Sequence, residues 1–245
     1  MAELIPREKL LFGRPIELKD FGIIHPPKIK LFLDELEYGN FKRVFSVRKE
    51  LYIDEDNEDY EKLRDFDLII YMNLMEDLIS SLKVLYKTDD IKIEMADKMD
   101  VSSIRIIVNN EYYINRDNYT KFADLILITL HEGNNVAEVE VKKELTEIEL
   151  KMEKRRKEFE RKKALKEAQK KKEEDTITIF DLANYIIHTD GSTFDYEKVL
   201  NLTVYQLINT FNLYRQKEGY STFMDYKTSG NFQIDENMEH WFFGK

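Results

Sequence analysis

The chain has 245 residues, of which 42% are hydrophobic and 12% aromatic, a formal net charge of −10 and no cysteine. This apolar content excludes global disorder, and the length allows one or two domains that each bury a core. The lack of cysteine excludes disulfides, thiolate metal sites and cysteine nucleophiles. No stretch approaches 18 uninterrupted apolar residues, and the first 20 residues carry charges throughout, so we expect neither a membrane-spanning helix nor a classical secretion signal.

Short strands followed by a helix are predicted for the first 40 residues. Leu11 and Phe12 precede a Gly-Arg-Pro turn, and residues 16–24 hold two further short apolar stretches. The two prolines after His25 suit the first turn of a helix, because backbone N–H groups there have no hydrogen-bond partner within the helix and proline lacks this group. Gly39 is a suitable stop for that helix.

Residues 61–86 predict one amphipathic helix, because apolar side chains recur at close to 3.6-residue spacing. These positions are Leu63, Phe66, Ile70, Leu74, Leu78, Leu82 and Leu85.

The period then changes from 3.6 to 2. Apolar residues alternate with polar ones over residues 91–95 and again over residues 104–108. Asn109 and Asn110 tolerate positive φ, so they predict a two-residue hairpin turn. We therefore expect a small antiparallel sheet that packs on the helix at 61–86.

A capped helix follows the sheet. Asn115 can cap it, and its apolar positions have helical spacing. They are Tyr119, Phe122, Ala123, Ile126 and Leu130.

Residues 142–173 form a highly charged segment. They contain no Gly or Pro and consist mostly of strong helix formers, which predicts one long helix. Four Glu-before-Lys pairs at i,i+4 spacing, such as Glu147 with Lys151, each stabilise it by about 0.2–0.5 kcal/mol. Arg155 and Lys162 interrupt the thin apolar side, so we expect most of this helix to face solvent.

Basic side chains gather in this segment although the whole chain is acidic. Residues 151–172 hold 12 Lys and Arg against 4 Glu. The run fits a solvated helix face, or contact with an acidic surface of this protein or of a partner. It does not favour nucleic acid, because acidic flanking domains oppose the approach of phosphates.

Two capping boxes predict helices in the C-terminal part of the chain. Thr178 with Asp181 and Thr203 with Gln206 have the required spacing. Residues 188–192 between these helices predict a loop.

The pattern therefore divides the chain into three parts. Residues 1–130 predict an α+β domain with a small antiparallel sheet, residues 131–176 a charged helical linker, and residues 177–245 a small, mainly α C-terminal domain.

Aromatic side chains gather near the C-terminus, where residues 220–232 predict a loop-rich stretch. Large aromatics normally pack in a core, which is the first interpretation. They are also typical of protein interfaces, which is the second. On the second interpretation the partner-binding residues are Tyr220, Phe223, Trp241, Phe242 and Phe243.

No set of residues predicts catalysis, a metal site or a cofactor. The acidic run at residues 54–59 lacks the Gly and the Glu that a calcium-binding loop requires at its sixth and twelfth positions. The four histidines are far apart in sequence, and no glycine-rich phosphate loop is present. His188, Asp190 and Ser192 share one loop, where neighbouring side chains seldom converge as a triad.

Seven short stretches spread over the chain have the character and order of one family's motifs. They are Leu11–Ile16, Ile24–Ile29, Leu36–Gly39, Ile106–Val108, Tyr113–Tyr119, Leu200–Leu207 and Glu239–Trp241. Together they resemble tail-assembly-chaperone-like proteins of phages that infect Gram-positive bacteria.

The resemblance implies a non-catalytic tail assembly chaperone that binds the tape measure protein in the host cytoplasm during tail morphogenesis. A long coiled-coil client exposes apolar seams that would otherwise aggregate. The alternative is a structural component of the tail or baseplate, which would remain in the virion. Either way the expected partner is the tape measure or another tail protein, and the family supplies no catalytic or cofactor residues. Homo-oligomerisation stays open.

Overall fold

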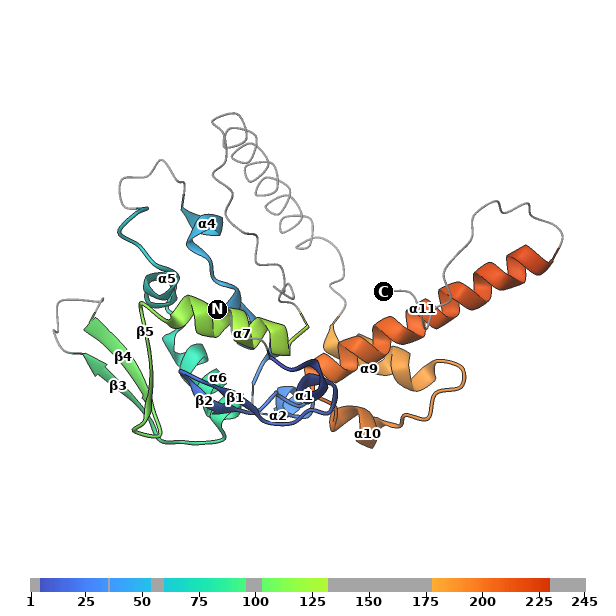
Figure 1. Cartoon of the computed structure of the whole chain (residues 1–245), viewed down its shortest axis with the longest axis horizontal. Coiled ribbons are helices and arrows are strands. Elements are labelled where there is room, and N and C mark those ends of the chain that lie inside the picture. Colours follow the sequence, from blue (N-terminus) through green and yellow to red (C-terminus); the bar gives the residue numbers. More distant parts are fainter. Residues whose placement is uncertain (1–4, 35, 54–59, 96–102, 132–177, 230–245) are drawn as a thin grey trace, which may run out of the picture.

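The computed structural model describes residues 5–34, 36–53, 60–95, 103–131 and 178–229. It confirms the predicted fold class, with helices and small antiparallel sheets in the N-terminal part and helices in the C-terminal part. A three-stranded sheet lies at one end of the molecule and a long helix, α11, projects at the other (Figure 1). The N-terminal elements are α1 (Arg7–Leu11), β1 (Ile16–Leu18), β2 (Gly22–Ile24), α2 (Leu31–Asp34), α3 (Tyr38–Ser46), α4 (Lys49–Tyr52), α5 (Asp65–Tyr71), α6 (Met75–Tyr86), β3 (Ile91–Met95), β4 (Ile104–Val108), β5 (Tyr112–Asn115) and α7 (Tyr119–Thr129). The C-terminal elements are α9 (Ile179–His188), α10 (Tyr196–Leu200) and α11 (Val204–Thr228).

The three-stranded sheet has the predicted hairpin at its centre. Its strand order is β3-β4-β5, and both pairs are antiparallel. Asn109 and Asn110 have φ of 54° and 56°, which is the left-handed conformation that a two-residue turn of this kind requires. The inner face, with Ile106, Val108 and Ile114, is buried, as the alternation predicted. β3 contacts α6, and β5 contacts α7.

Helix α7 lies at the centre of the core. Its five predicted apolar positions are all fully buried. The Phe122 ring lies 5.0 Å from Phe21, 6.0 Å from Phe45 and 6.3 Å from Tyr86, measured between ring centroids. The Phe122 side chain therefore contacts the turn between β1 and β2, α3 and α6 at once, so the packing of the N-terminal core depends on it.

The single helix expected at residues 61–86 is wrong. The segment forms α5 and α6, which are separated at Asn73, whose φ is 58°. Asn adopts the left-handed conformation more readily than most residues and commonly ends helices. Glu76 and Asp77 then occupy the first turn of α6, where they interact favourably with the helix dipole. The apolar spacing continues through the break, which is why the pattern concealed it.

The expectations for the first 40 residues also need correction. Leu11 ends a helix, α1, and does not belong to a strand, while β1 and β2 pair as a short hairpin. The proline-started helix is only the single turn α2. Gly39 lies inside the first turn of α3 and does not end a helix. Phe41, Val44 and Phe45 have helical spacing and are fully buried, and this signal could have revealed α3.

Candidate functional site

Both helices that form the candidate site begin with the predicted capping boxes. In α9, Thr178 Oγ1 accepts from Asp181 N–H at 3.2 Å, and Thr178 N–H donates to the Asp181 carboxylate at 2.7 Å. In α11, Thr203 and Gln206 exchange the corresponding bonds at 3.2 and 2.9 Å. These reciprocal bonds satisfy N–H groups that a helix start otherwise leaves without partners.

The start of α11 is joined to the N-terminal part by backbone hydrogen bonds. Ile29 N–H donates to Leu202 C=O at 2.9 Å, and Val204 N–H donates to Pro27 C=O at 3.1 Å. The Gln206 side-chain amide also donates to Leu11 C=O at 2.8 Å. We call this region the α11 joint. It brings together three of the stretches on which the family resemblance rests.

A groove runs between α9 and α11, and we call it the α9–α11 groove. It has a volume of about 600 Å³. The Tyr185 and Phe211 rings meet edge to face across it, with centroids 4.9 Å apart. Its lining residues are Asp181, Leu182, Tyr185, Phe211, Arg215, Glu218, Gly219 and Thr222.

Charged side chains surround the aromatic part of the groove. The Arg215 guanidinium lies 5.7 Å from the centre of the Phe211 ring, and the Tyr185 hydroxyl donates to the Glu218 carboxylate. Burial, followed by this hydrogen bond, raises the pKa of Tyr185. An apolar floor with charges of both signs at its rim is typical of a protein-binding groove.

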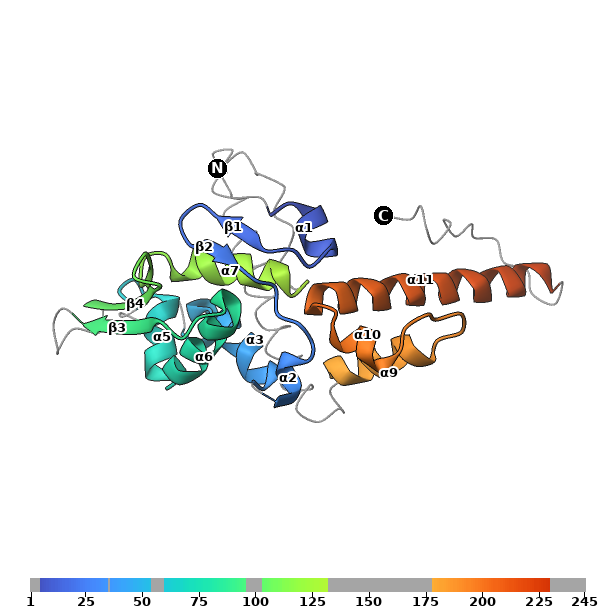
Figure 2. The same ribbon diagram turned by 90° about the horizontal axis from the view of Figure 1, so that it is seen from below.

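Helix α11 continues well beyond α9 and α10 (Figure 2). The predicted loop-rich character is therefore wrong for residues 220–228, which are helical. Gly219 weakens a helix by about 1 kcal/mol relative to Ala but does not have to end it, because the residues around it are adequate helix formers. Of the predicted binding residues, Tyr220 and Phe223 lie on this projecting part and are half-buried. Trp241, Phe242 and Phe243 lie outside the described residues.

His188 is the last residue of α9, so the predicted loop begins one residue later and holds only Asp190 and Ser192. Ser192 Oγ accepts from Phe194 N–H at 3.2 Å, and the His188 ring packs against Tyr196 with its Nε2 3.5 Å from the tyrosine hydroxyl. Nearby, α9 and α10 enclose a smaller apolar hollow of about 250 Å³, which Leu33 also lines.

Two buried carboxylates hold α5 in place. Asp65 accepts from Lys49 N–H and from the Thr120 hydroxyl, both at 2.8 Å. Asp67 accepts from Nε and a terminal nitrogen of Arg116, both at 2.9 Å. Since these bonds join α5 to the start of α4 and to the β5–α7 region, we assign them a structural role.

Within the described residues, no three His, Asp or Glu side chains are grouped as metal ligands. None of the helices in those ranges is long and apolar enough to cross a membrane. The acidic run at residues 54–59 and nearly all of the expected linker, residues 131–176, fall outside them. The division of the chain into domains stays a prediction.

Comparison with known proteins adds information on the C-terminal part of the chain. No curated protein and no solved structure matches the sequence. Residues 169–243, which include α9, α10 and α11, match the family model described as the YomV second domain. That family is derived from phages, so the match indicates that this is a phage protein.

Proposed function

We propose that the chain is a non-catalytic tail assembly chaperone that binds the tape measure protein in the host cytoplasm, and that the α9–α11 groove receives a helical segment of this client. The observation that carries the proposal is the groove itself, with its aromatic floor and charged rim on two helices. Grooves of this kind bind amphipathic helices through apolar side chains at i, i+3, i+4 and i+7.

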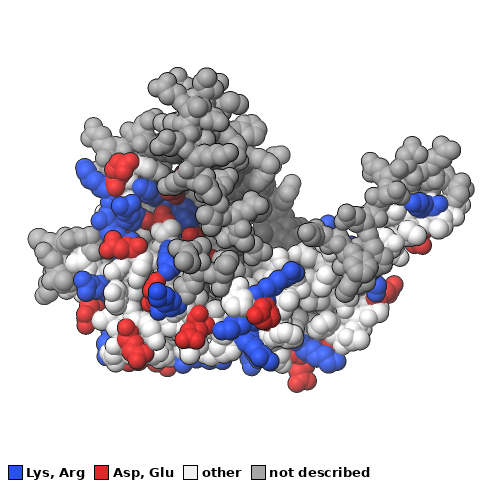
Figure 3. Space-filling model, in the orientation of Figure 1, with Lys and Arg blue, Asp and Glu red and all other residues white. Residues whose placement is uncertain are grey.

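The projecting end of α11 extends the same surface. A client helix in the groove can continue along α11 past Gly219, where Tyr226 lies on the helix face that carries Arg215 and Thr222. Phe223 lies at the side of this face and Tyr220 on the opposite face, so contacts with these two residues require a client that wraps around α11. Met224 and Tyr226 are exposed on this part of the helix. Acidic and basic side chains are interspersed over the face in Figure 3, which suits a protein partner better than a phosphate backbone.

The alternative is a structural protein of the tail or baseplate. The resemblance supports it less directly, but the same groove could bind a neighbouring tail subunit. Mass spectrometry of purified virions distinguishes the two, because a chaperone is absent from finished particles and a structural part is present in stoichiometric copies.

The direct test is co-expression of the chain with the tape measure protein. Wild type should keep the client soluble and co-purify with it. Phe211→Ala and Arg215→Glu should each weaken the complex, by roughly thirtyfold if the residue is a hot spot worth about 2 kcal/mol. Arg215 is exposed, so its substitution leaves the fold intact.

Tyr113→Ala is the matched control, because Tyr113 is an exposed aromatic on β5, far from the groove. Circular dichroism must show that every variant folds. If Phe211→Ala and Arg215→Glu bind the client as well as Tyr113→Ala does, the groove is not the binding site. If wild type does not bind the client and is found in virions, the structural alternative replaces the chaperone proposal.

A further inference from the structure

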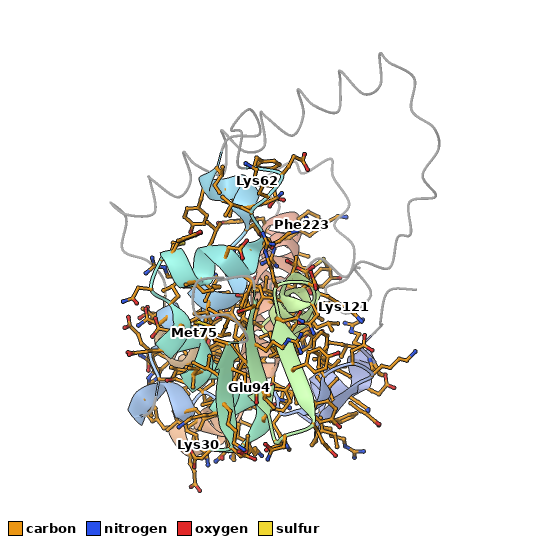
Figure 4. All side chains as sticks on the ribbon, turned by 90° about the vertical axis from the view of Figure 1, so that its left-hand side faces the viewer. Lys30, Lys62, Met75, Glu94, Lys121 and Phe223 are labelled. Carbon is orange, nitrogen blue, oxygen red and sulfur yellow. The ribbon has the colours of Figure 1, made fainter. Side chains whose placement is uncertain are left out.

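Strand β3 is an open edge of the three-stranded sheet. The strand order places it at one end, with β4 on one side and no strand of the described residues on the other. Figure 4 looks onto this sheet, with Glu94 labelled on it. Four of the five β3 residues are exposed, including the large apolar side chains of Ile93 (47%) and Met95 (46%). Exposed apolar edge strands are ready sites for pairing with another strand.

The hydrogen-bonding groups on the open side of β3 can be assigned from the ladder. Asn109 N–H donates to Asp90 C=O at 2.9 Å, so residues 90, 92 and 94 direct their backbone groups toward β4. Ile93 and Met95 therefore direct their N–H and C=O groups away from β4. These are the groups that an added strand would bond.

We propose that β3 pairs antiparallel with β3 of a second copy of this chain, centred on Ile93, and so forms a continuous six-stranded sheet across the dimer. The sequence Ile-Lys-Ile-Glu-Met is self-complementary in this register. Ile93 lies opposite its own copy, and Ile91 lies opposite the partner's Met95. On the other face Lys92 lies opposite the partner's Glu94, and Glu94 opposite the partner's Lys92.

The two faces of the paired strands would gain different interactions. On the face that packs on the core, Ile93 and Met95 would be buried against the apolar side chains of the partner strand. In the single chain these two side chains are about half exposed. The two Lys–Glu pairs neutralise charge on the outer side. Lys92 now contacts Asp90 at 3.4 Å and Asn110 at 2.6 Å. Since Lys92 is exposed, exchanging these partners costs little.

Charge reversal tests the register. Lys92→Glu places two Glu–Glu pairs in the interface, and Glu94→Lys places two Lys–Lys pairs there. Each should weaken the dimer by roughly tenfold or more in sedimentation equilibrium, because like charges directly opposite each other are unfavourable. The double variant Lys92→Glu with Glu94→Lys restores both opposite-charge pairs and should dimerise like wild type.

A chain without cysteine allows a second, independent test. In a hydrogen-bonded antiparallel pair the opposite Cα atoms are about 5.5 Å apart, a distance that a disulfide spans. Ile93→Cys should therefore form a disulfide-linked dimer on mild oxidation. Ile23→Cys is the matched control, because Ile23 on β2 is similarly exposed at 53% but lies outside the proposed interface.

Three results would overturn the proposal: wild type that stays monomeric at about 100 µM, single charge reversals that dimerise as well as wild type, or a double variant that fails to recover. Equal cross-linking of Ile93→Cys and Ile23→Cys would also overturn it. The pairing does not depend on the client proposed above, since these measurements need only the purified chain.

Discussion

Gly22 and Gly191 form a natural pair for separating backbone strain from packing. Both have φ of +76°, a conformation that costs an L-residue about 1–2 kcal/mol. A Cβ added at Gly22 would lie 2.4 Å from the ring of Tyr112, whereas at Gly191 the nearest atom is the flexible Lys217 Nζ at 3.8 Å. Both Gly→Ala substitutions therefore strain the backbone, but only Gly22→Ala also overpacks against a neighbouring ring.

We expect Gly191→Ala to lower the free energy of unfolding by about 1–2 kcal/mol, which is the backbone cost alone. Gly22→Ala should lower it by about 2–5 kcal/mol, because overpacking against Tyr112 adds about 1–3 kcal/mol to the same backbone cost. Urea denaturation followed by circular dichroism measures both, and an unchanged slope with denaturant would show that the extent of unfolding is the same.

A double variant completes the experiment. Tyr112→Ala removes the ring that the new methyl group meets, so Gly22→Ala should cost less in that background than in wild type. If Gly22→Ala and Gly191→Ala differ by less than about 0.5 kcal/mol, or if removal of the ring gives no relief, the β1–β2 hairpin does not pack on β5 as described.

Three further substitutions test the core and its titration. Asp67→Ala leaves Arg116 without its buried partner and should cost about 3 kcal/mol in urea denaturation; a cost below about 1 kcal/mol would make the pair equivalent to an exposed one. Tyr86→Phe removes the 2.7 Å hydrogen bond from the Tyr86 hydroxyl to Phe21 C=O. This should lower the free energy of unfolding by about 1–3 kcal/mol, because the carbonyl loses its partner inside the core. An unchanged thermal stability would contradict this hydrogen bond. Burial, and then the charge of Lys87, lower the pKa of His25 from 6.5, so the folded state binds fewer protons there than the unfolded state. The stabilisation from neutral His25 is complete above pH 6.5 and is lost as the pH falls through the folded pKa; His25→Gln should flatten this part of the stability profile, and parallel profiles for variant and wild type would refute the assignment.

Local patterns predicted the elements that depend on neighbours in sequence. The Asn109-Asn110 hairpin, the buried face of α7 and both capping boxes follow from turn chemistry, period and short-range hydrogen bonds. The break at Asn73 was concealed because the apolar period continues through it. Gly219 and its aromatic neighbours favour a loop, but α11 continues through them, because a single Gly does not have to end a helix.

Less of the candidate site could be predicted from the sequence. Only their residue type singles out Tyr220 and Phe223, and their role in binding stays a prediction. The groove depends on Leu182, Tyr185 and Phe211 meeting across two helices, and nothing in the sequence states which helix faces which. The α11 joint was also missed, because backbone hydrogen bonds between distant segments leave no mark in side-chain pattern.

Because α11 is attached to the N-terminal part near its first turn, at the α11 joint, a small rotation there produces a large displacement at its other end. With 25 residues at a rise of about 1.5 Å each, α11 reaches roughly 37 Å from its attached end. A rotation of about 10° at the joint would therefore move the far end by about 6 Å, close to one turn of a client helix. On the function proposed above, such a pivot would shift a bound helical segment by about one of its turns, while the hydrogen bonds within α11 stay intact.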